Sequence, residues 1–179
     1  MWIFLTLAAL AIAASSPVAQ PRLLLNPEDF ARIDRLAAAH AWVADARDAI
    51  IAAADGFPKS HLDRFGLEQL ELPPDGGQWS LWYVCPVHGA KLQYHAPATH
   101  RCPVDRQTYT GWPYDQVIFE RRHVDLAHAA RDNALAWRLT GRRSYAETAA
   151  GILVQYADRY GGYPLKDKDN RADTRGAAR

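Results

Sequence analysis

Apolar residues recur with a helical period along most of this chain. After Asn26 and Pro27, the spacing predicts an amphipathic helix, and a break near His40 would divide it into two shorter helices. Asn26 is a favourable N-cap and Pro27 suits the first helical position, so the start is well marked. Gly56 and Pro58 end this helical segment, because both residue types interrupt helices.

Two further helices are predicted in the second half of the chain, joined by a short turn. The first spans residues 115–139, with Asp115 as its cap and Gly141 after its end. The second begins with Ser144 as N-cap and Glu147 three residues later, which is the pattern of a capping box. Because the connection is short, we expect the two helices to be antiparallel neighbours.

Between these helical segments the pattern changes to short apolar runs and turns. Residues 57–78 are typical of a connector with weak apolar anchors. Two short strands are predicted at 79–84 and 91–94, on either side of a turn that starts at Cys85. Residues 96–110 show no regular pattern. The chain is therefore predicted to be mainly α-helical, with a small stapled β-hairpin or knuckle inserted between the helices at residues 79–112.

Composition and charge are those of a globular protein of 179 residues. The net charge is +1 and the basic residues are scattered, so no nucleic-acid partner is expected. The six Trp and eight Tyr carry flat amphipathic rings, which suit sugar faces as well as protein cores. The sequence contains no phosphate-binding glycine loop and no His-Glu-x-x-His motif, so neither chemistry is predicted.

The first residues are typical of an export signal. Residues 2–14 are almost wholly apolar and small residues follow, but the run is shorter than the roughly 20 residues that span a bilayer. We therefore predict a signal peptide at 1–19, a periplasmic or secreted protein, and no stable membrane insertion after cleavage. The absence of Lys and Arg ahead of the apolar run departs from the pattern. A buried helix or an uncleaved anchor are the alternatives.

The sharpest group of candidate ligands is a repeated turn. Cys85-Pro-Val-His88 recurs as Cys102-Pro-Val-Asp105, which resembles the paired knuckles of small zinc ribbons. Cys85, His88, Cys102 and Asp105 would then hold a structural zinc ion. The alternative is a Cys85–Cys102 disulfide, which an oxidising compartment favours. It would close a loop of about 16 residues and stabilise the fold by roughly 3 kcal/mol. Two free thiols are the remaining alternative. In both the metal and the disulfide interpretation the role is structural.

Three residues at or beyond the end of the insert are candidates for contact with a sugar. Trp112 and Tyr114 stand on a loop that leads into a helix, and His123 lies on the apolar stripe of that helix. Core packing is the alternative for all three, and a hydrogen-bonded core histidine is the more common role for a residue placed like His123.

The combined motifs resemble the amino-terminal part of the heparinase II/III-like polysaccharide lyases. The matching runs are Trp82-Tyr-Val-Cys-Pro-Val-His-Gly, Arg101-Cys-Pro-Val-Asp, Gly111-Trp-Pro-Tyr-Asp and the helix from His123 onward. The resemblance covers most of residues 21–165. It implies that residues 20–165 form the first helical hairpins of an incomplete α/α toroid, with 166–179 as a truncated loop or tail.

The same resemblance implies cleavage of a uronate-containing polysaccharide by β-elimination. A polar group must neutralise the uronate carboxylate, and a Tyr or His must remove the C5 proton. No cofactor is needed for this chemistry, and the expected partner is an anionic polysaccharide. The family's catalytic positions are expected beyond Arg179, so the chain alone is expected to be inactive. A glycoside hydrolase on an α/α toroid, or a non-catalytic helical carbohydrate-binding or scaffold domain, are the alternatives.

Overall fold

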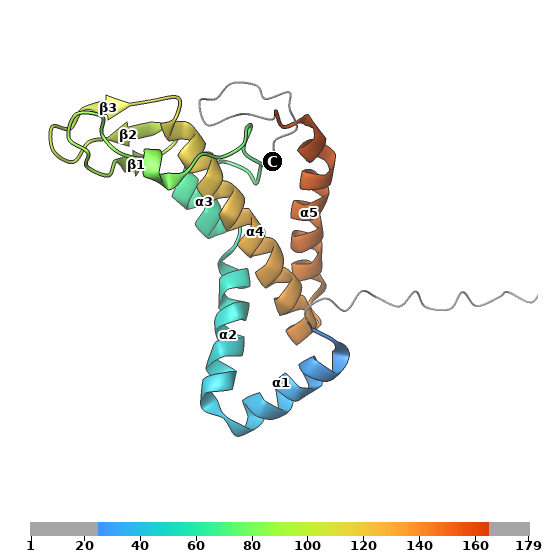
Figure 1. The fold of residues 1–179 in the computed structure, drawn as a ribbon. Helices are drawn as coiled ribbons and strands as arrows, with labels where there is room; N and C mark the ends of the chain where they lie inside the picture. Colours follow the sequence, from blue (N-terminus) through green and yellow to red (C-terminus); the bar gives the residue numbers. More distant parts are fainter. Residues whose placement is uncertain (1–24, 165–179) are drawn as a thin grey trace, which may run out of the picture.

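A computed structural model describes residues 25–164 and confirms a mainly helical protein with a small antiparallel sheet (Figure 1). The helices are α1 (Pro27–Ala39), α2 (Ala41–Gly56), α3 (Lys59–Phe65), α4 (Tyr114–Thr140) and α5 (Arg143–Arg159), the strands are β1 (Gln93–His95), β2 (Thr99–Arg101) and β3 (Thr108–Tyr109), and the short 3₁₀ turns are η1 (Ser80–Trp82) and η2 (Tyr160–Gly162). The predicted signal peptide at 1–19 and the tail at 166–179 lie outside the described residues.

The first helical segment is divided in two, as its sequence predicts. The Asn26 side chain accepts a hydrogen bond of 3.0 Å from the Asp29 N–H, and the Asn26 N–H donates one of 3.1 Å back to the Asp29 carboxylate. This reciprocal pair is a capping box that defines the start of α1. At His40 the backbone is extended, which separates α1 from α2. Both features follow from local sequence.

The connector at 57–78 contains a helix that the sequence analysis missed. α3 occupies Lys59–Phe65 and ends at Gly66, whose φ of +64° suits glycine. His61 and Phe65 are both buried, four residues apart on one face of α3. The helix has only seven residues, so tertiary burial rather than helical periodicity stabilises it.

Helices α4 and α5 form the predicted antiparallel hairpin, with the long α4 crossing the molecule from the insert to the turn at Gly141 (Figure 1). Leu126 and Ala130 of α4 pack with Ile152 of α5 in a buried cluster. Gly141 has a φ of +72° and ends α4, as expected. Among the helices of residues 25–164, none combines the length and apolar character that crossing a bilayer requires.

The predicted N-terminal caps of both helices of this hairpin are wrong. α5 begins at Arg143, one residue before Ser144, and Glu147 pairs with Arg143 at 2.9 Å instead of closing a capping box. Asp115 lies inside α4, and its carboxylate accepts a hydrogen bond of 2.7 Å from His100 Nε2. Glu147 is taken by a neighbour on the same helix, whereas Asp115 is taken by a histidine from strand β2.

The insert also differs from its predicted strands. Within the predicted strand at 79–84, Ser80–Trp82 form the 3₁₀ turn η1, and only Val84 pairs with Lys91, as an isolated bridge. The sheet has the order β1-β2-β3, so two of its strands fall in the stretch predicted as irregular. Residues of the insert, including Tyr83 and Leu92, share a buried cluster with Val117 of α4. This packing attaches the insert to the first turns of α4.

His123 connects α4 to its surroundings through both ring nitrogens. Its Nδ1 lies 2.7 Å from the Tyr156 hydroxyl on α5, and its Nε2 lies 3.0 Å from the Asp75 carbonyl oxygen. A carbonyl can only accept, so Nε2 donates and Nδ1 accepts from the hydroxyl. His123 therefore fits the core-histidine interpretation, and burial lowers its pKa below the ordinary 6.5.

We expect His123 to make the protein less stable in mild acid. Below about pH 6.5 the unfolded imidazole takes up a proton that the folded one resists, so the free energy of unfolding falls with pH until the folded pKa is passed. Above that range both states are neutral and the contribution is complete. Urea unfolding between about pH 7.5 and about pH 5 should show a shallower slope for His123→Gln than for the parent. Equal slopes would contradict this role.

Candidate metal centre

Two turns of the insert have the same backbone arrangement. In the first, the Cys85 carbonyl accepts from the Gly89 N–H at 2.8 Å, and in the second the Cys102 carbonyl accepts from the Arg106 N–H at 3.0 Å. Gly89 and Arg106 both have a left-handed backbone, with φ of +62° and +63°. Glycine tolerates this conformation without strain, whereas Arg106 adopts it in spite of its side chain. The repeated sequence thus becomes a repeated structure.

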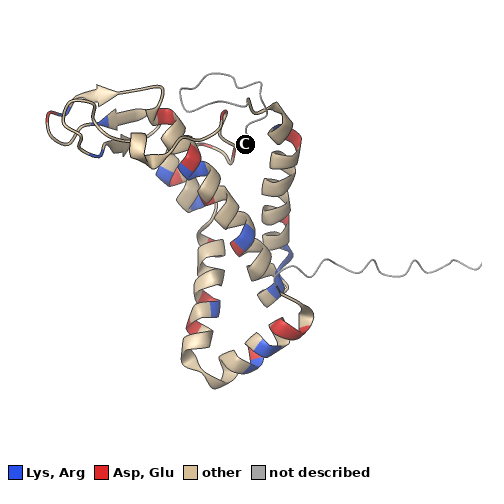
Figure 2. Cartoon of the chain, in the orientation of Figure 1, with Lys and Arg blue, Asp and Glu red and all other residues tan. Residues whose placement is uncertain are grey.

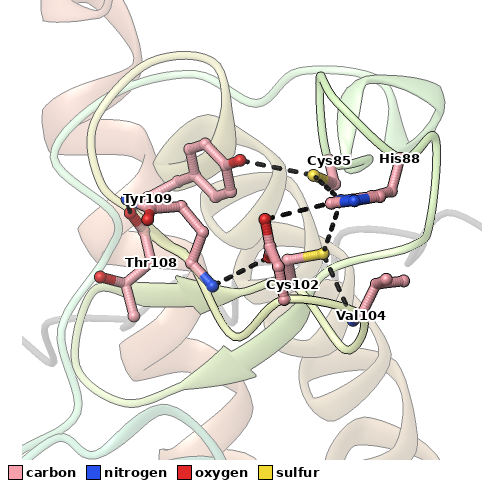
Figure 3. Close-up of polar contacts among 8 residues, drawn as sticks. Cys85, His88, Cys102, Val104, Thr108 and Tyr109 are labelled. Atoms are coloured by element: carbon pink, nitrogen blue, oxygen red, sulfur yellow. Dashed lines mark hydrogen bonds and ion pairs between the residues drawn. The ribbon is translucent and has the colours of Figure 1, made fainter.

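The two turns bring their side chains together at one atom, His88 Nδ1 (Figure 3). The Cys85 sulfur lies 3.5 Å and the Cys102 sulfur 3.6 Å from this nitrogen. The three donor atoms lie within 4.8 Å of one another. Both cysteines are buried, while His88 is on the solvent side. The described residues therefore include a Cys-His-Cys group that could hold a metal ion.

Asp105, the fourth predicted ligand, stands beside this group rather than within it. Its Oδ2 lies 3.6 Å from His88 Nδ1, and its other contacts are local, including a 3.0 Å hydrogen bond from the Gln107 N–H to Oδ1. That hydrogen bond is the main reason why the pKa of Asp105 is lowered. The carboxylate is thus ionised and close enough to move onto a bound ion.

Hydrogen bonds alone do not explain this convergence. Two sulfur atoms and a carboxylate oxygen surround His88 Nδ1, which carries at most one hydrogen. Each of these atoms can bind a metal once it is deprotonated, and a cation between them would offset their mutual repulsion. The arrangement is therefore compatible with a metal-binding site.

The two thiols have different acidities. Although burial raises the pKa of Cys85, hydrogen bonds from Tyr109, from the backbone N–H groups of His88 and Val87 and from the His88 ring lower it to about 6. Burial raises the pKa of Cys102. The Tyr109 hydroxyl lies 3.4 Å from the Cys85 sulfur, and this hydrogen bond raises the pKa of Tyr109 to about 12. Cys85 is thus poised as a thiolate, the form that binds metals.

The cysteines are not bridged in the structure. A disulfide needs a sulfur–sulfur distance of about 2.05 Å. The geometry instead places a histidine nitrogen near both sulfur atoms. The structure is thus compatible with the interpretation as a metal site. The experiments described below distinguish this site from a Cys85–Cys102 disulfide.

The three predicted sugar contacts lie in three different environments. Trp112 is partly exposed, and its ring centroid lies 6.0 Å from that of Trp82. Tyr114 packs against Tyr109 inside the aromatic cluster of the insert, and His123 is engaged between α4 and α5 as described above. They do not form one site, so Trp112 is the one that keeps a surface for a ligand.

Two side chains of this region were missed by the sequence analysis. Tyr109 was placed in an irregular stretch, yet it donates the hydrogen bond that lowers the pKa of Cys85. Trp82 was placed in a strand, yet it is exposed beside Trp112. The position of Tyr109, shortly after the turn that starts at Cys102, is a sequence signal that could have identified it as a neighbour of the ligands. No local signal pairs Trp82 with a residue 30 positions away.

Comparisons of the chain with protein-family models, with curated proteins and with solved structures found no match. The resemblance to the heparinase II/III-like lyases therefore stays a prediction that rests on motifs in the sequence. The candidate metal centre is independent of it, since it is built from distances among its own atoms.

Proposed function

We propose that Cys85, His88 and Cys102 bind a structural zinc ion, and that the chain is the amino-terminal, zinc-stabilised part of an exported lyase of uronate-containing polysaccharides. The first part is supported by the metal-centre geometry. The second is supported by the sequence motifs and by the helical hairpin that follows them.

The observation that carries the zinc proposal is the pair of sulfur–nitrogen distances. Zinc bonds of about 2.3 Å to sulfur and about 2.05 Å to nitrogen, at the tetrahedral angle, place the two ligand atoms about 3.5–3.6 Å apart. The distances from His88 Nδ1 are 3.5 Å to Cys85 and 3.6 Å to Cys102. Asp105 or a water molecule would supply the fourth ligand, since structural zinc is four-coordinate.

A structural rather than catalytic role follows from where the ligands are. The sulfur atoms are buried against Tyr109 and the cluster that contains Val117. The strands of the insert are two or three residues long, too short to be stable by pairing alone. A metal that links the two turns would hold the insert together and keep it on α4.

The lyase proposal assigns no proton transfer to the described residues. His123 of α4 contacts Tyr156, but both of its ring nitrogens are hydrogen-bonded within the protein. Its role is therefore in packing. What the chain contributes is the helical hairpin and the candidate sugar surface at Trp112. Proton abstraction and leaving-group protonation belong to the further toroid helices that the family resemblance implies.

The experiment is to express the full product of the gene that encodes this chain and to mix it with alginate, heparan sulfate and hyaluronan. A rise in ultraviolet absorbance from the new carbon–carbon double bond is expected, because β-elimination leaves an unsaturated uronate. Reducing ends that appear without that absorbance would identify a hydrolase instead. Retention of the polysaccharide without cleavage would identify a binding module.

A further inference from the structure

The structure holds a second feature that the metal centre does not use, a cavity of about 330 Å³ between α3, β1 and the first half of α4. This volume is at the lower end of the range of small-ligand sites. Phe65 and Ile118 form its apolar floor, and Tyr94 lines one side. Arg64, Arg121 and His128 stand around its opening. Figure 2 shows basic and acidic residues close together where α3 meets α4.

One of the two acids that line the cavity, Asp125, already has its partners on α3. Asp125 Oδ2 accepts a hydrogen bond of 2.6 Å from Nδ1 of the buried His61, and Asp125 Oδ1 accepts one of 2.8 Å from Arg64. Its carboxylate is therefore paired with Arg64 and hydrogen-bonded to His61, both on α3. Glu120, the other acid of the cavity, is next to Arg121 along the helix, so the two side chains leave α4 in different directions.

Arg121 has a guanidinium that contacts an aromatic ring but pairs with no carboxylate in the described part of the chain. Its Cζ lies 4.5 Å from the centroid of the Tyr83 ring, a cation–π contact that holds the side chain in place. Among residues 25–164, no carboxylate lies within ion-pair distance of Arg121. A guanidinium has five N–H donors in a planar fork, which fits a carboxylate.

We propose that this cavity binds the carboxylate of an acidic sugar ring, with Arg121 as the anion contact. The apolar floor and Tyr94 would pack against the C–H face of the ring, as aromatic residues do with sugars. His128 and Glu120 offer a ring nitrogen and a carboxylate for sugar hydroxyls. This inference rests on the proposed function and adds to it a location and a contact residue within the described part of the chain.

A charged ligand suits the cavity better than a neutral one. A neutral sugar would leave the Arg121 guanidinium without an anionic partner, whereas a carboxylate would form charge-assisted hydrogen bonds with it. The same anion chemistry could come from a uronate carboxylate or from a sulfate ester. The planar carboxylate matches the guanidinium fork, so we commit to the uronate.

The test is isothermal titration of the chain with trigalacturonate, with maltotriose and with a sulfated neutral trisaccharide. We expect binding of trigalacturonate, and roughly ten- to a hundredfold weaker binding after Arg121→Gln, which removes a charged hydrogen-bond donor. Arg138→Gln is the matched control. Arg138 is on the same helix and lies 5.1 Å over the Phe30 ring, but outside the cavity. It should leave the dissociation constant unchanged.

Several results would overturn the proposal. Equal binding of maltotriose, stronger binding of the sulfated sugar, or an unchanged dissociation constant in Arg121→Gln would each reject the carboxylate pocket. If no trisaccharide binds while the full gene product still forms unsaturated uronate, the cavity proposal fails and the lyase proposal stands. If neither occurs, both fail. Thermal unfolding of both variants checks that they fold, since Arg121 also contacts Tyr83.

Discussion

Replacing Cys102 with alanine is expected to abolish stoichiometric zinc binding and to unfold the insert at residues 79–112. The site would lose one of its three ligand residues, Cys102, whose sulfur lies 3.6 Å from His88 Nδ1. Binding of structural zinc contributes about 10–16 kcal/mol in zinc-finger peptides, so its loss should exceed the effect of most single substitutions. Elemental analysis of the purified protein, together with near-ultraviolet circular dichroism of the insert's tyrosines, measures both consequences.

Two variants on the same turn are compared with Cys102→Ala: one is a control, and the other tests the fourth ligand. Val104→Ala removes an exposed side chain and should keep full zinc content. Asp105→Asn keeps the shape but removes the charge, and should weaken zinc binding only if this carboxylate is the fourth ligand. A chelator should release the zinc and expose two thiols to a thiol reagent. Protein without zinc, whose thiols react only after reduction, would show instead that Cys85 and Cys102 form a disulfide.

His100→Ala is expected to cost about 3 kcal/mol or more of unfolding free energy. His100 is fully buried at the junction between the sheet and α4. Its Nε2 donates to the Asp115 carboxylate at 2.7 Å, and its Nδ1, 2.7 Å from the Tyr83 hydroxyl, accepts that proton. Alanine would leave a cavity and would deprive the buried Tyr83 hydroxyl and the partly buried Asp115 carboxylate of their partner, which adds to the loss of packing.

His95→Ala is the matched control, because His95 is an exposed histidine on the neighbouring strand β1. It should change the unfolding free energy by less than about 0.5 kcal/mol. Denaturant unfolding of zinc-loaded protein measures both variants under the same conditions. Similar losses for His95→Ala and His100→Ala would contradict a specific role for the Tyr83–His100–Asp115 chain of hydrogen bonds.

Features that depend on a few consecutive residues were predictable. The N-cap at Asn26, the break at His40 and the end of α4 at Gly141 all follow from backbone preferences that act within one helical turn. The repeat of Cys-Pro-Val also predicted two equivalent turns, and the structure gives both of them a left-handed residue at the same position. Such local preferences are present in the unfolded chain as well as the folded one.

Features that depend on distant partners were not predictable. Asp115 has the pattern of a cap, but a histidine 15 residues earlier takes its carboxylate. α3 lacks a strong helical pattern, yet it forms because His61 meets Asp125, 64 residues away. The pattern of polar and apolar residues does not show which of several possible partners a side chain contacts, because that depends on the packing of the whole domain.

The candidate sites divide in the same way. The sequence names Cys85, His88, Cys102 and Asp105 as ligands and leaves metal and disulfide as alternatives, because residue type and spacing define which atoms can bind. The structure groups the first three and places Asp105 beside them. The distances that place both sulfurs on one ring nitrogen come from the packing of two turns against α4. The cavity at Arg121 has no sequence signature at all. Its walls come from α3, β1 and α4, and a cavity forms only when separate elements pack together.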